Sequence, residues 1–399
     1  DHQLRHGATL MVISNYSQSL RDHFMSGCRP HFGPVNPLWK YIDLFHRYVA
    51  RLGYMLSLDS PAYSTALYYD VRGIWAGAKY RKQAIKQHFS ISEALQRQQC
   101  DFDYVDDDAL ATGRIESGGI QIGKMRYETL LLPSTDWMDS KAQDNLAAFR
   151  RSGGRVVSAN QIDSVIPLVR LDPRHSGIRC TKRAWSGHSL YFLTNESGRS
   201  VRLKITFPEQ VNPTLFDPMD GNFYSIPSHP SSYGTTIPWR FDSFGSALFV
   251  FGPRATAKRP IFRPGKHVLR LSKGWELKPI RKHKPASHDY KIVNLRTRFK
   301  NVPLGDWRKH IGNFFSGEAL YRIHFENSRS DEALLELGRV AYACSVTLNG
   351  RENGRKFWGP YQFNLGRNLV VGKNCIEVSI CNTLANAISD PKVLWHWQT

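Results

Sequence analysis

The chain has 399 residues, 41% of them hydrophobic, which is enough for about three globular domains of ~100–200 residues each. No apolar run approaches the ~18 residues of a membrane-spanning helix, so no membrane partner is expected. The net charge is +20 and the pI about 9.8, and the segment from Arg254 to Lys300 holds 15 Lys and Arg residues against two acids, Glu276 and Asp289.

The first residues already have the pattern of packed structure. Residue 1 is Asp rather than Met, and the apolar run at 8–14 predicts a buried strand with no start signal before it. One buried strand is not stable alone. We therefore expect the chain to be the C-terminal part of a larger protein, and the absence of a leader pattern here says nothing about secretion.

A strong helix signal follows a loop rich in Gly, Pro and His at 27–34. Asn36 is a good N-cap, and Pro37 fits the first helical position because its missing N–H would be unpaired there in any case. Apolar residues then recur at helical spacing and predict one buried helix face that runs to about Ser57. These residues are Leu38, Ile42, Phe45, Val49, Leu52 and Leu56.

Residues 61–172 alternate between strand and helix patterns. The predicted strands are 65–69, 102–105, 127–132 and 155–158. The predicted helices are 91–98, capped by Ser90, and 140–151, stopped by Gly153-Gly154. Short apolar strands separated by helices predict a parallel sheet with helices on both faces. The run Asp106-Asp107-Asp108 could bind a cation, but it fits a helix N-terminus better.

After about residue 173 the pattern becomes antiparallel β. The runs 189–194 and 201–206 flank Asn195-Glu196-Ser197-Gly198, which predicts a hairpin. A further strand at 247–251 is ended by Gly252-Pro253. Residues 173–255 are therefore predicted to form a small antiparallel β domain.

The last block, residues 256–399, is predicted to hold a basic linker followed by a β-sandwich. Its predicted strands are 320–325, 334–337, 343–348 and 375–381, with a tight turn at Asn349-Gly350. The basic segment favours a polyanion such as an acidic polysaccharide or a nucleic acid, unless it is only a solvated linker. A nucleic-acid partner is not expected, because stacking aromatic residues are not interleaved with the charges.

The motifs that would identify a common chemistry are missing. The chain has no GxGxxG, Walker A, HExxH or GxSxG pattern. Its six cysteines lack CxxC pairing and are predicted to be mostly buried thiols. Cys375 and Cys381 lie on one predicted strand, roughly 20 Å apart at ~3.3 Å per residue, which is too far for a disulfide.

Several stretches carry a resemblance to a known family. The runs 31–39 (HFGPVNPLW) and 48–56 (YVARLGYML) resemble the segment after the last barrel strand of the α-L-rhamnosidases of glycoside hydrolase family 106. Residues 101–108 and 118–133 resemble the α/β domain of that family. The C-terminal block is similar to the sugar-binding β-sandwich that closes those enzymes and recurs in family 2 glycosidases. The runs concerned are 315–322, 337–340, 346–350, 358–361, 372–374 and 382–386.

This resemblance covers nearly the whole chain and implies a multidomain α/β plus β fold. The expected order is the end of a (β/α)8 barrel, a flavodoxin-like parallel α/β domain, a small antiparallel β domain, and a basic linker with a galactose-binding-like β-sandwich. The expected boundaries are 1–60, 61–172, 173–255 and 256–399. Only the last barrel strand, residues 8–14, would be retained.

The resemblance also bears on catalysis. Barrel enzymes carry their catalytic groups at the carboxyl ends of the strands, so the acid and base are expected mostly upstream of Asp1. Glycoside hydrolysis needs two carboxyl groups ~5–5.5 or ~6.5–9.5 Å apart, and Glu93, Glu116 and Glu128 do not suggest such a pair. No cofactor is expected in this chain, although the resemblance implies calcium.

The predicted function is the C-terminal part of a glycoside hydrolase that cleaves terminal α-L-rhamnosyl or related residues from plant-type polysaccharides or glycosides. Its partner would be a carbohydrate, including an acidic polysaccharide, and that substrate class favours a periplasmic or extracellular location. Where rhamnosidases carry histidines after the barrel strand, this chain has Ser14, Asn15 and Gln18, a departure that concerns sugar specificity more than class. The predicted substrate-binding residues are Asn15, Tyr16, His31, Asn36 and Trp39.

Two of these residue assignments, and the predicted function itself, have an alternative. Asn36 could serve only as a helix cap, and Trp39 only as core. The whole chain could instead be a non-catalytic carbohydrate-binding protein that acts through its C-terminal sandwich. Trp358 and Tyr361 would then form a stacking platform, unless they pack the edge of that sandwich.

Overall fold

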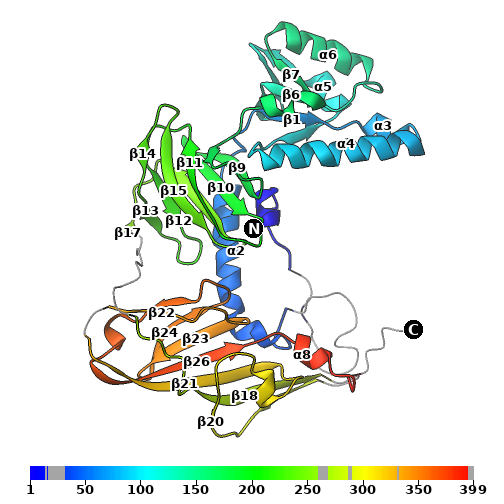
Figure 1. Cartoon of the computed structure of the whole chain (residues 1–399). Coiled ribbons are helices and arrows are strands. Elements are labelled where there is room, and N and C mark those ends of the chain that lie inside the picture. Colours follow the sequence, from blue (N-terminus) through cyan, green and yellow to red (C-terminus); the bar gives the residue numbers. More distant parts are fainter. Residues whose placement is uncertain (14–15, 17–31, 259–267, 286–289, 330–331, 394–399) are drawn as a thin grey trace. The chain divides into compact units, whose positions relative to one another are not determined.

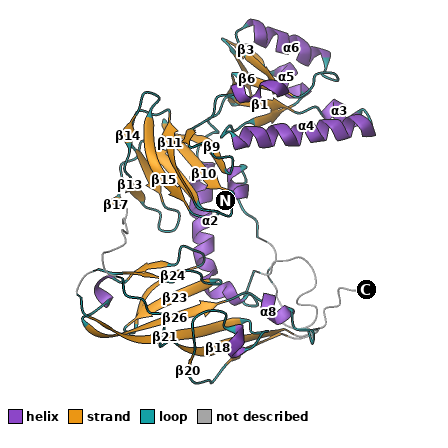
Figure 2. Ribbon diagram, in the orientation of Figure 1, coloured by secondary structure: helices purple, strands orange, loops and turns teal. Residues whose placement is uncertain are grey.

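The computed structural model describes residues 1–13, 16, 32–258, 268–285, 290–329 and 332–393 (Figures 1 and 2). The described residues form a mixed α/β structure with many antiparallel sheets. The chain divides into two compact units: unit 1 is Asp1–Leu10 with Ala50–Pro260, and unit 2 is Met11–Val49 with Ile261–Thr399. The four predicted domain boundaries stay predictions. No helix in the described ranges is long and apolar enough to cross a membrane.

Unit 1 contains a four-stranded parallel sheet with the order β2-β1-β6-β7. Because neighbouring side chains of a strand point to opposite faces, Leu130 packs with residues of α6, whereas Leu131 packs with residues of α4. Figure 1 shows these two helices on opposite sides of the sheet. The predicted parallel sheet with helices on both faces is therefore confirmed. Its elements are β1 (Thr65–Tyr68), β2 (Asp103–Val105), β6 (Thr129–Leu132), β7 (Arg155–Ser158), α4 (Ala78–Arg97) and α6 (Ser140–Arg151).

The helices of this region correct one prediction and confirm another. Ser90 lies inside α4 and does not cap it, because the helix begins at Ala78. The residues from 78 to 83 are all exposed, so no apolar spacing marks this part of the helix. Asp106 does act as a cap, since its side chain accepts a hydrogen bond from the Ala109 N–H at 3.0 Å. The smaller elements are α1 (His2–Arg5), α3 (Val71–Trp75), α5 (Asp107–Thr112), β3 (Arg114–Glu116), β4 (Gly119–Ile122) and β5 (Met125–Tyr127).

The rest of unit 1 consists of two sheets on one shared core, and all their strand pairs are antiparallel except β13 with β17, which is parallel. Their orders are β17-β13-β12-β16-β10-β9 and β14-β15-β11-β8. Inward residues of both sheets, such as Tyr191, Phe207 and Phe249, belong to the same buried cluster. The strands are β8 (Arg170–Asp172), β9 (Ile178–Trp185), β10 (His188–Asn195), β11 (Val201–Phe207), β12 (Pro213–Phe216), β13 (Phe223–Ser225), β14 (His229–Pro230), β15 (Thr235–Phe241), β16 (Ser246–Phe251) and β17 (Ala257–Lys258).

The hairpin predicted at 195–198 is wrong. β10 pairs with β9 and β16, whereas β11 pairs with β15 and β8 of the other sheet. The Asn195 side chain donates hydrogen bonds to the carbonyl oxygens of Arg199 and Asp242, both at 2.8 Å. These hydrogen bonds stabilise a connection that runs from one sheet to the other. Residues 195–198 therefore form a turn, but the two strands that it joins do not pair with each other.

Unit 2 is built on an antiparallel sheet with the order β19-β18-β21-β26-β23-β24, with β20 also paired to β18. The predicted basic linker is wrong over 276–285 and 290–294, because these residues form β18 and β19. The predicted turn at Asn349-Gly350 is confirmed: both residues have positive φ, 52° and 79°, and they join β23 to β24. The elements are β18 (Glu276–Pro285), β19 (Tyr290–Asn294), β20 (Lys300–Asn301), β21 (Gly317–Asn327), β22 (Leu334–Glu336), β23 (Ala343–Leu348), β24 (Arg351–Lys356), β25 (Gln362–Asn364), β26 (Gly372–Cys381), α7 (Arg308–Ile311) and α8 (Ala385–Ile388).

The barrel strand predicted at 8–14 is not a strand over its described part, 8–13. Leu10 and Val12 are 84% and 89% exposed. No strand in the described ranges pairs with this run, and an apolar run without a partner strand has no ladder to join. Of the predicted buried thiols, Cys100, Cys180, Cys344 and Cys381 are buried, Cys375 is half-buried, and Cys28 lies outside the described residues.

The segment before α2 (Ile42–Ser57) is fixed to the sheet of unit 2 at Val35. The Tyr290 hydroxyl donates a hydrogen bond to the Val35 carbonyl and also contacts Nδ1 of His283. All three residues are buried. Burial, with a smaller contribution from the charge of Arg281, lowers the pKa of His283 to about 4, so this imidazole is neutral in the folded protein at pH 7. This contact places Asn36 and the short helix Pro37–Tyr41 beside β18.

A first prediction concerns the end of α6. A Cβ on Gly154 would lie 2.3 Å from the ring of Phe149, which is fully buried. We expect Gly154→Ala to lower the free energy of unfolding by about 1–3 kcal/mol through overpacking. Gly198→Ala is the matched control, because its Cβ would meet its nearest neighbour, Phe244, at 3.7 Å. Equal midpoints for the two variants in chemical denaturation would contradict this packing.

A second prediction concerns pH. The unfolded chain protonates His283 near the ordinary pKa of 6.5, while the folded protein does so only near 4. Stability should therefore fall as pH drops from 6.5 to 4, and this group should account for about 1–3 kcal/mol of the loss. We expect His283→Asn to show a smaller loss of melting temperature between pH 7.5 and 4.5 than the unaltered chain.

His324→Asn is the control for that experiment, because His324 is exposed on the neighbouring strand β21. It should keep the pH dependence of the unaltered chain. A His283→Asn profile that is parallel to that of the unaltered chain would show that His283 does not carry the effect.

Candidate functional site

Three of the five predicted substrate-binding residues come together in unit 2. The rings of Tyr16 and Trp39 meet edge to face, with centroids 6.1 Å apart. The Tyr16 ring also lies against Gly33, where a Cβ would be 3.3 Å away. Asn36 stands at the start of the short helix that carries Trp39. Asn15 and His31 lie outside the described residues.

Asn36 and Trp39 line a cavity of about 250 Å³, and Tyr16 contacts Trp39 outside that lining. One wall is the segment before α2, and the other is formed by β18 and β19. The cavity is lined by Pro34, Asn36, Pro37, Trp39, Lys40, Arg281, His283 and Ile292. Its size is just below the ~300–1,000 Å³ of drug-sized sites, so a single small ring is a suitable occupant.

Asn36 and Trp39 have different local roles. The Asn36 side chain accepts a hydrogen bond from the Leu38 N–H at 3.0 Å, so it caps the helix as its sequence position predicts. Trp39 is 37% exposed and Tyr16 60% exposed, so neither aromatic ring is core. Of the two rings, Trp39 lines the cavity, and the apolar face of a sugar ring could stack on its accessible surface.

The charges around this cavity are unequal. Lys40 pairs with Glu318, which is 3% exposed and also accepts a hydrogen bond from the Ser379 hydroxyl. Arg281 also lines the cavity, and His283 is neutral at pH 7 for the reason given above. No carboxylate stands among the lining residues. The cavity can therefore offer hydrogen-bond donors and an aromatic ring, but its lining holds no acid and base pair.

The three glutamates considered in the sequence are surface ion-pair partners. Each is exposed and pairs with an arginine close to it in sequence. The pairs are Glu93 with Arg97, Glu116 with Arg114, and Glu128 with Arg126. Exposed carboxylates that each pair with a neighbouring arginine are typical of a solvated surface and not of a catalytic pair.

Sequence reasoning missed Lys40, Arg281 and His283 in this cavity. Lys40 sits next to the predicted Trp39, but nothing in the sequence distinguishes it from an ordinary surface lysine. Arg281 and His283 were missed because the basic segment was predicted to be a linker, whereas it contains the strand β18. Pro279 was the available signal, since a proline inside a strand indicates an edge or a bulge.

Trp358 and Tyr361, the stacking platform of the alternative carbohydrate-binding hypothesis, differ in their exposure. Tyr361 belongs to the main core cluster of unit 2 and donates a hydrogen bond to the Tyr342 carbonyl at 2.5 Å. Trp358 is half-buried and meets the Tyr48 ring edge to face at 5.2 Å. Trp358 is thus the one member of that pair with an accessible surface.

The calcium that the resemblance implies stays a prediction. Among the described residues, no group of three or more His, Cys, Asp or Glu side chains is arranged to hold a metal ion.

Comparisons with known proteins agree with this architecture. No protein-family model matches the chain. The structure is similar to a rhamnosidase from Novosphingobium sp. PP1Y, with a TM-score of 0.68 and 18% identity over 92% of this chain and 40% of that one. A candidate β-glucuronidase of Formosa agariphila is 31% identical over 86 residues, which is 20% of this chain and 7% of that protein.

The chain thus spans less than half of the length of both proteins. At 18% identity the structural likeness concerns the fold, and it extends over nearly all of this chain. The chain therefore has a fold similar to that of a glycoside hydrolase.

Proposed function

We propose that this chain acts as the C-terminal portion of a glycoside hydrolase that removes terminal α-L-rhamnosyl or related residues from plant-type polysaccharides or glycosides. The observation that carries the proposal is the fold similarity to a rhamnosidase over 92% of the chain. The resemblance of residues 31–39 and 48–56 to family 106 points to the same class. A periplasmic or extracellular location belongs to the same proposal, because such substrates occur there.

The cavity beside Trp39 is the proposed sugar contact of this chain. A deoxy sugar has an apolar face suited to an aromatic ring and hydroxyl groups suited to charged donors. Trp39 supplies the ring, while Lys40 and Arg281 supply donors at the same cavity. The chemistry of cleavage requires two carboxyl groups, and this lining contributes none. The role that these residues support is binding and orienting the sugar.

The second candidate is a non-catalytic carbohydrate-binding protein that acts through the C-terminal strands. The observation that favours this second candidate is the half-buried ring of Trp358, part of which is accessible. The burial of Tyr361 removes half of the platform that this alternative needs. The first proposal is therefore better supported.

A third prediction tests the sugar contact. We expect the chain to bind L-rhamnose weakly, and Trp39→Ala to weaken this binding about fivefold to tenfold through loss of ring stacking. Ligand-observed NMR titration measures such affinities. Trp137→Ala is the matched control: Trp137 is 42% exposed and meets Tyr80 edge to face at 5.2 Å, so it is a similar aromatic pair in unit 1.

The outcomes separate the two candidates. Binding that survives Trp39→Ala but is lost in Trp358→Ala would overturn the proposed contact and favour the binding protein. Turnover of 4-nitrophenyl α-L-rhamnoside that Glu318→Gln abolishes would place a catalytic carboxylate in this chain and contradict a purely binding role for the cavity.

A further inference from the structure

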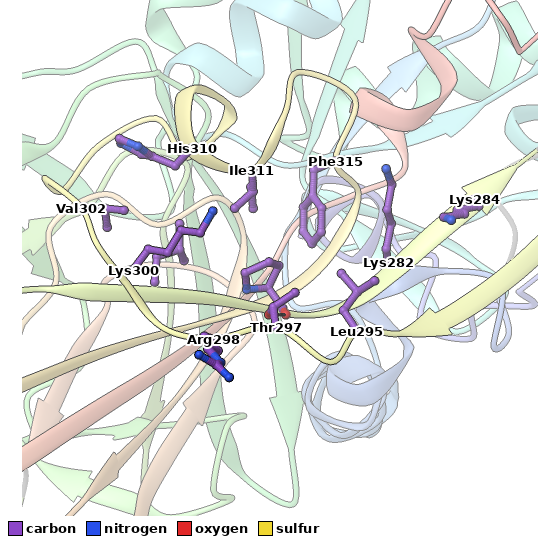
Figure 3. A pocket seen from close by; sticks show the side chains of 12 residues that line it. Lys282, Lys284, Leu295, Thr297, Arg298, Lys300, Val302, His310, Ile311 and Phe315 are labelled. Carbon is purple, nitrogen blue, oxygen red and sulfur yellow. Dashed lines mark hydrogen bonds between the residues drawn. The ribbon is translucent and has the colours of Figure 1, made fainter.

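A second cavity of about 340 Å³ lies on unit 2 and is edged by positive charges. Its cationic side chains come from β18, β20 and the segment between β19 and α7. They are Lys282, Lys284, Arg298 and Lys300, and the imidazole of His310, from α7, lies at the same cavity. In the view of Figure 3, Lys282 and Lys284 lie on one side of the Phe315 ring, and Lys300 and His310 on the other.

The described part of the chain provides no counterion for these lysines and this arginine. Within the described ranges, no carboxylate pairs with Lys282, Arg298 or Lys300. The acids on the surrounding elements are bound to other cations. Glu276 pairs with Arg322, Asp306 with Arg308, and Glu318 with Lys40.

The frame that carries the cations is tied to β18 at several points. The Leu295 N–H donates to the Ile280 carbonyl at 2.8 Å, and the Val302 N–H donates to the Trp275 carbonyl at 3.0 Å. Between them, the Thr297 hydroxyl donates to the Pro279 carbonyl at 2.7 Å. The segment from 295 to 302 is thus anchored at both ends and in the middle, which holds Arg298 and Lys300 at the rim.

The bottom of the cavity is apolar. Its apolar lining residues are Leu277, Pro279, Leu295, Val302, Ile311 and Phe315. A bare anion such as phosphate has no surface that would use this lining. A uronic acid residue has both an apolar ring face and a carboxylate. A nucleic acid would need exposed rings for stacking, but Phe315, the aromatic residue of this lining, is 2% exposed.

The geometry points to this cavity as a binding site for an acidic oligosaccharide, with uronate carboxylates on the cationic rim and a sugar ring over the apolar floor. The choice of a saccharide rests on the proposed function, whereas the preference for anions rests on the unneutralised cations alone. The site is separate from the cavity beside Trp39 and does not require catalysis. It would hold the polymer while another part of the protein acts on it.

Isothermal titration with trigalacturonate tests this site. We expect Arg298→Gln/Lys300→Gln to weaken binding about tenfold or more, because charge-assisted hydrogen bonds are lost. The matched control is Lys291→Gln/Arg296→Gln, which removes the same charge from the same basic segment outside the cavity lining. We expect less than a threefold change there. Binding should also weaken steeply between 0.1 and 1 M salt, as the Debye length falls from ~10 to ~3 Å.

Each result decides the matter. Equal losses in the two double variants would replace the site by a diffuse positive field and overturn the proposal. Stronger binding of single-stranded DNA than of trigalacturonate would assign the cavity to nucleic acid. Equal affinity for neutral maltotriose would remove the anion preference. Because the titration involves neither Trp39 nor rhamnose, failure here leaves the proposed function standing, and failure of the Trp39 test leaves this site standing.

Discussion

A β-bulge in β18 determines which side chains of this strand line each of the two cavities described in unit 2. The register of β18 against β21 shifts between Pro279 and Arg281, which places one extra residue, Ile280, opposite a single step of the partner strand. A bulge of this kind reverses the alternation of side chains beyond it. Leu277 and Pro279 therefore share a cavity with Lys282 and Lys284, while Arg281 and His283 line the other cavity.

Without the bulge, the apolar and cationic pairs would fall on different faces of the sheet. Side chains alternate with a period of two, so Leu277 and Pro279 would lie with Arg281 and His283. The cationic rim would then have no apolar floor. Pro279 is compatible with the bulge because a proline cannot donate to the ladder and is tolerated where pairing is irregular.

The sequence was most informative where local signals and long-range pairing agree. The helix 140–151 and the strand 155–158 have the predicted bounds, because an amphipathic helix, a glycine pair and a short apolar run each point to one structure. Local signals gave wrong predictions where the structure depends on which strand pairs with which. The turn after Asn195 looks like that of a hairpin, yet its two strands belong to different sheets.

Two further failures have the same physical origin. The apolar run at 8–13 has a strand pattern but no partner in the described ranges, and Val12 is 89% exposed. The strand β18 has partners on both sides but a basic composition that is typical of linkers. In both cases the ladder, which is not visible in the sequence, determines the structure. Asn36 and Trp39 of the site could be predicted from the sequence because they lie at a helix start. Arg281 and His283 could not, because they lie on a strand about 240 residues further along the chain.

The two cavities lie on opposite faces of one strand and differ in their chemistry. On one face, burial keeps His283 neutral, and the charge of Glu318 is taken up by Lys40, so the Trp39 ring and a few donors dominate. On the other face, Asp306 and Glu276 pair with Arg308 and Arg322, so they do not neutralise the cationic side chains of the cavity. Like charges that line one cavity repel one another, and a bound anion would reduce this repulsion. If the cavity binds an acidic oligosaccharide as proposed, a neutral ring would gain only the apolar floor, whereas an acidic ring would also relieve the repulsion between the cationic side chains.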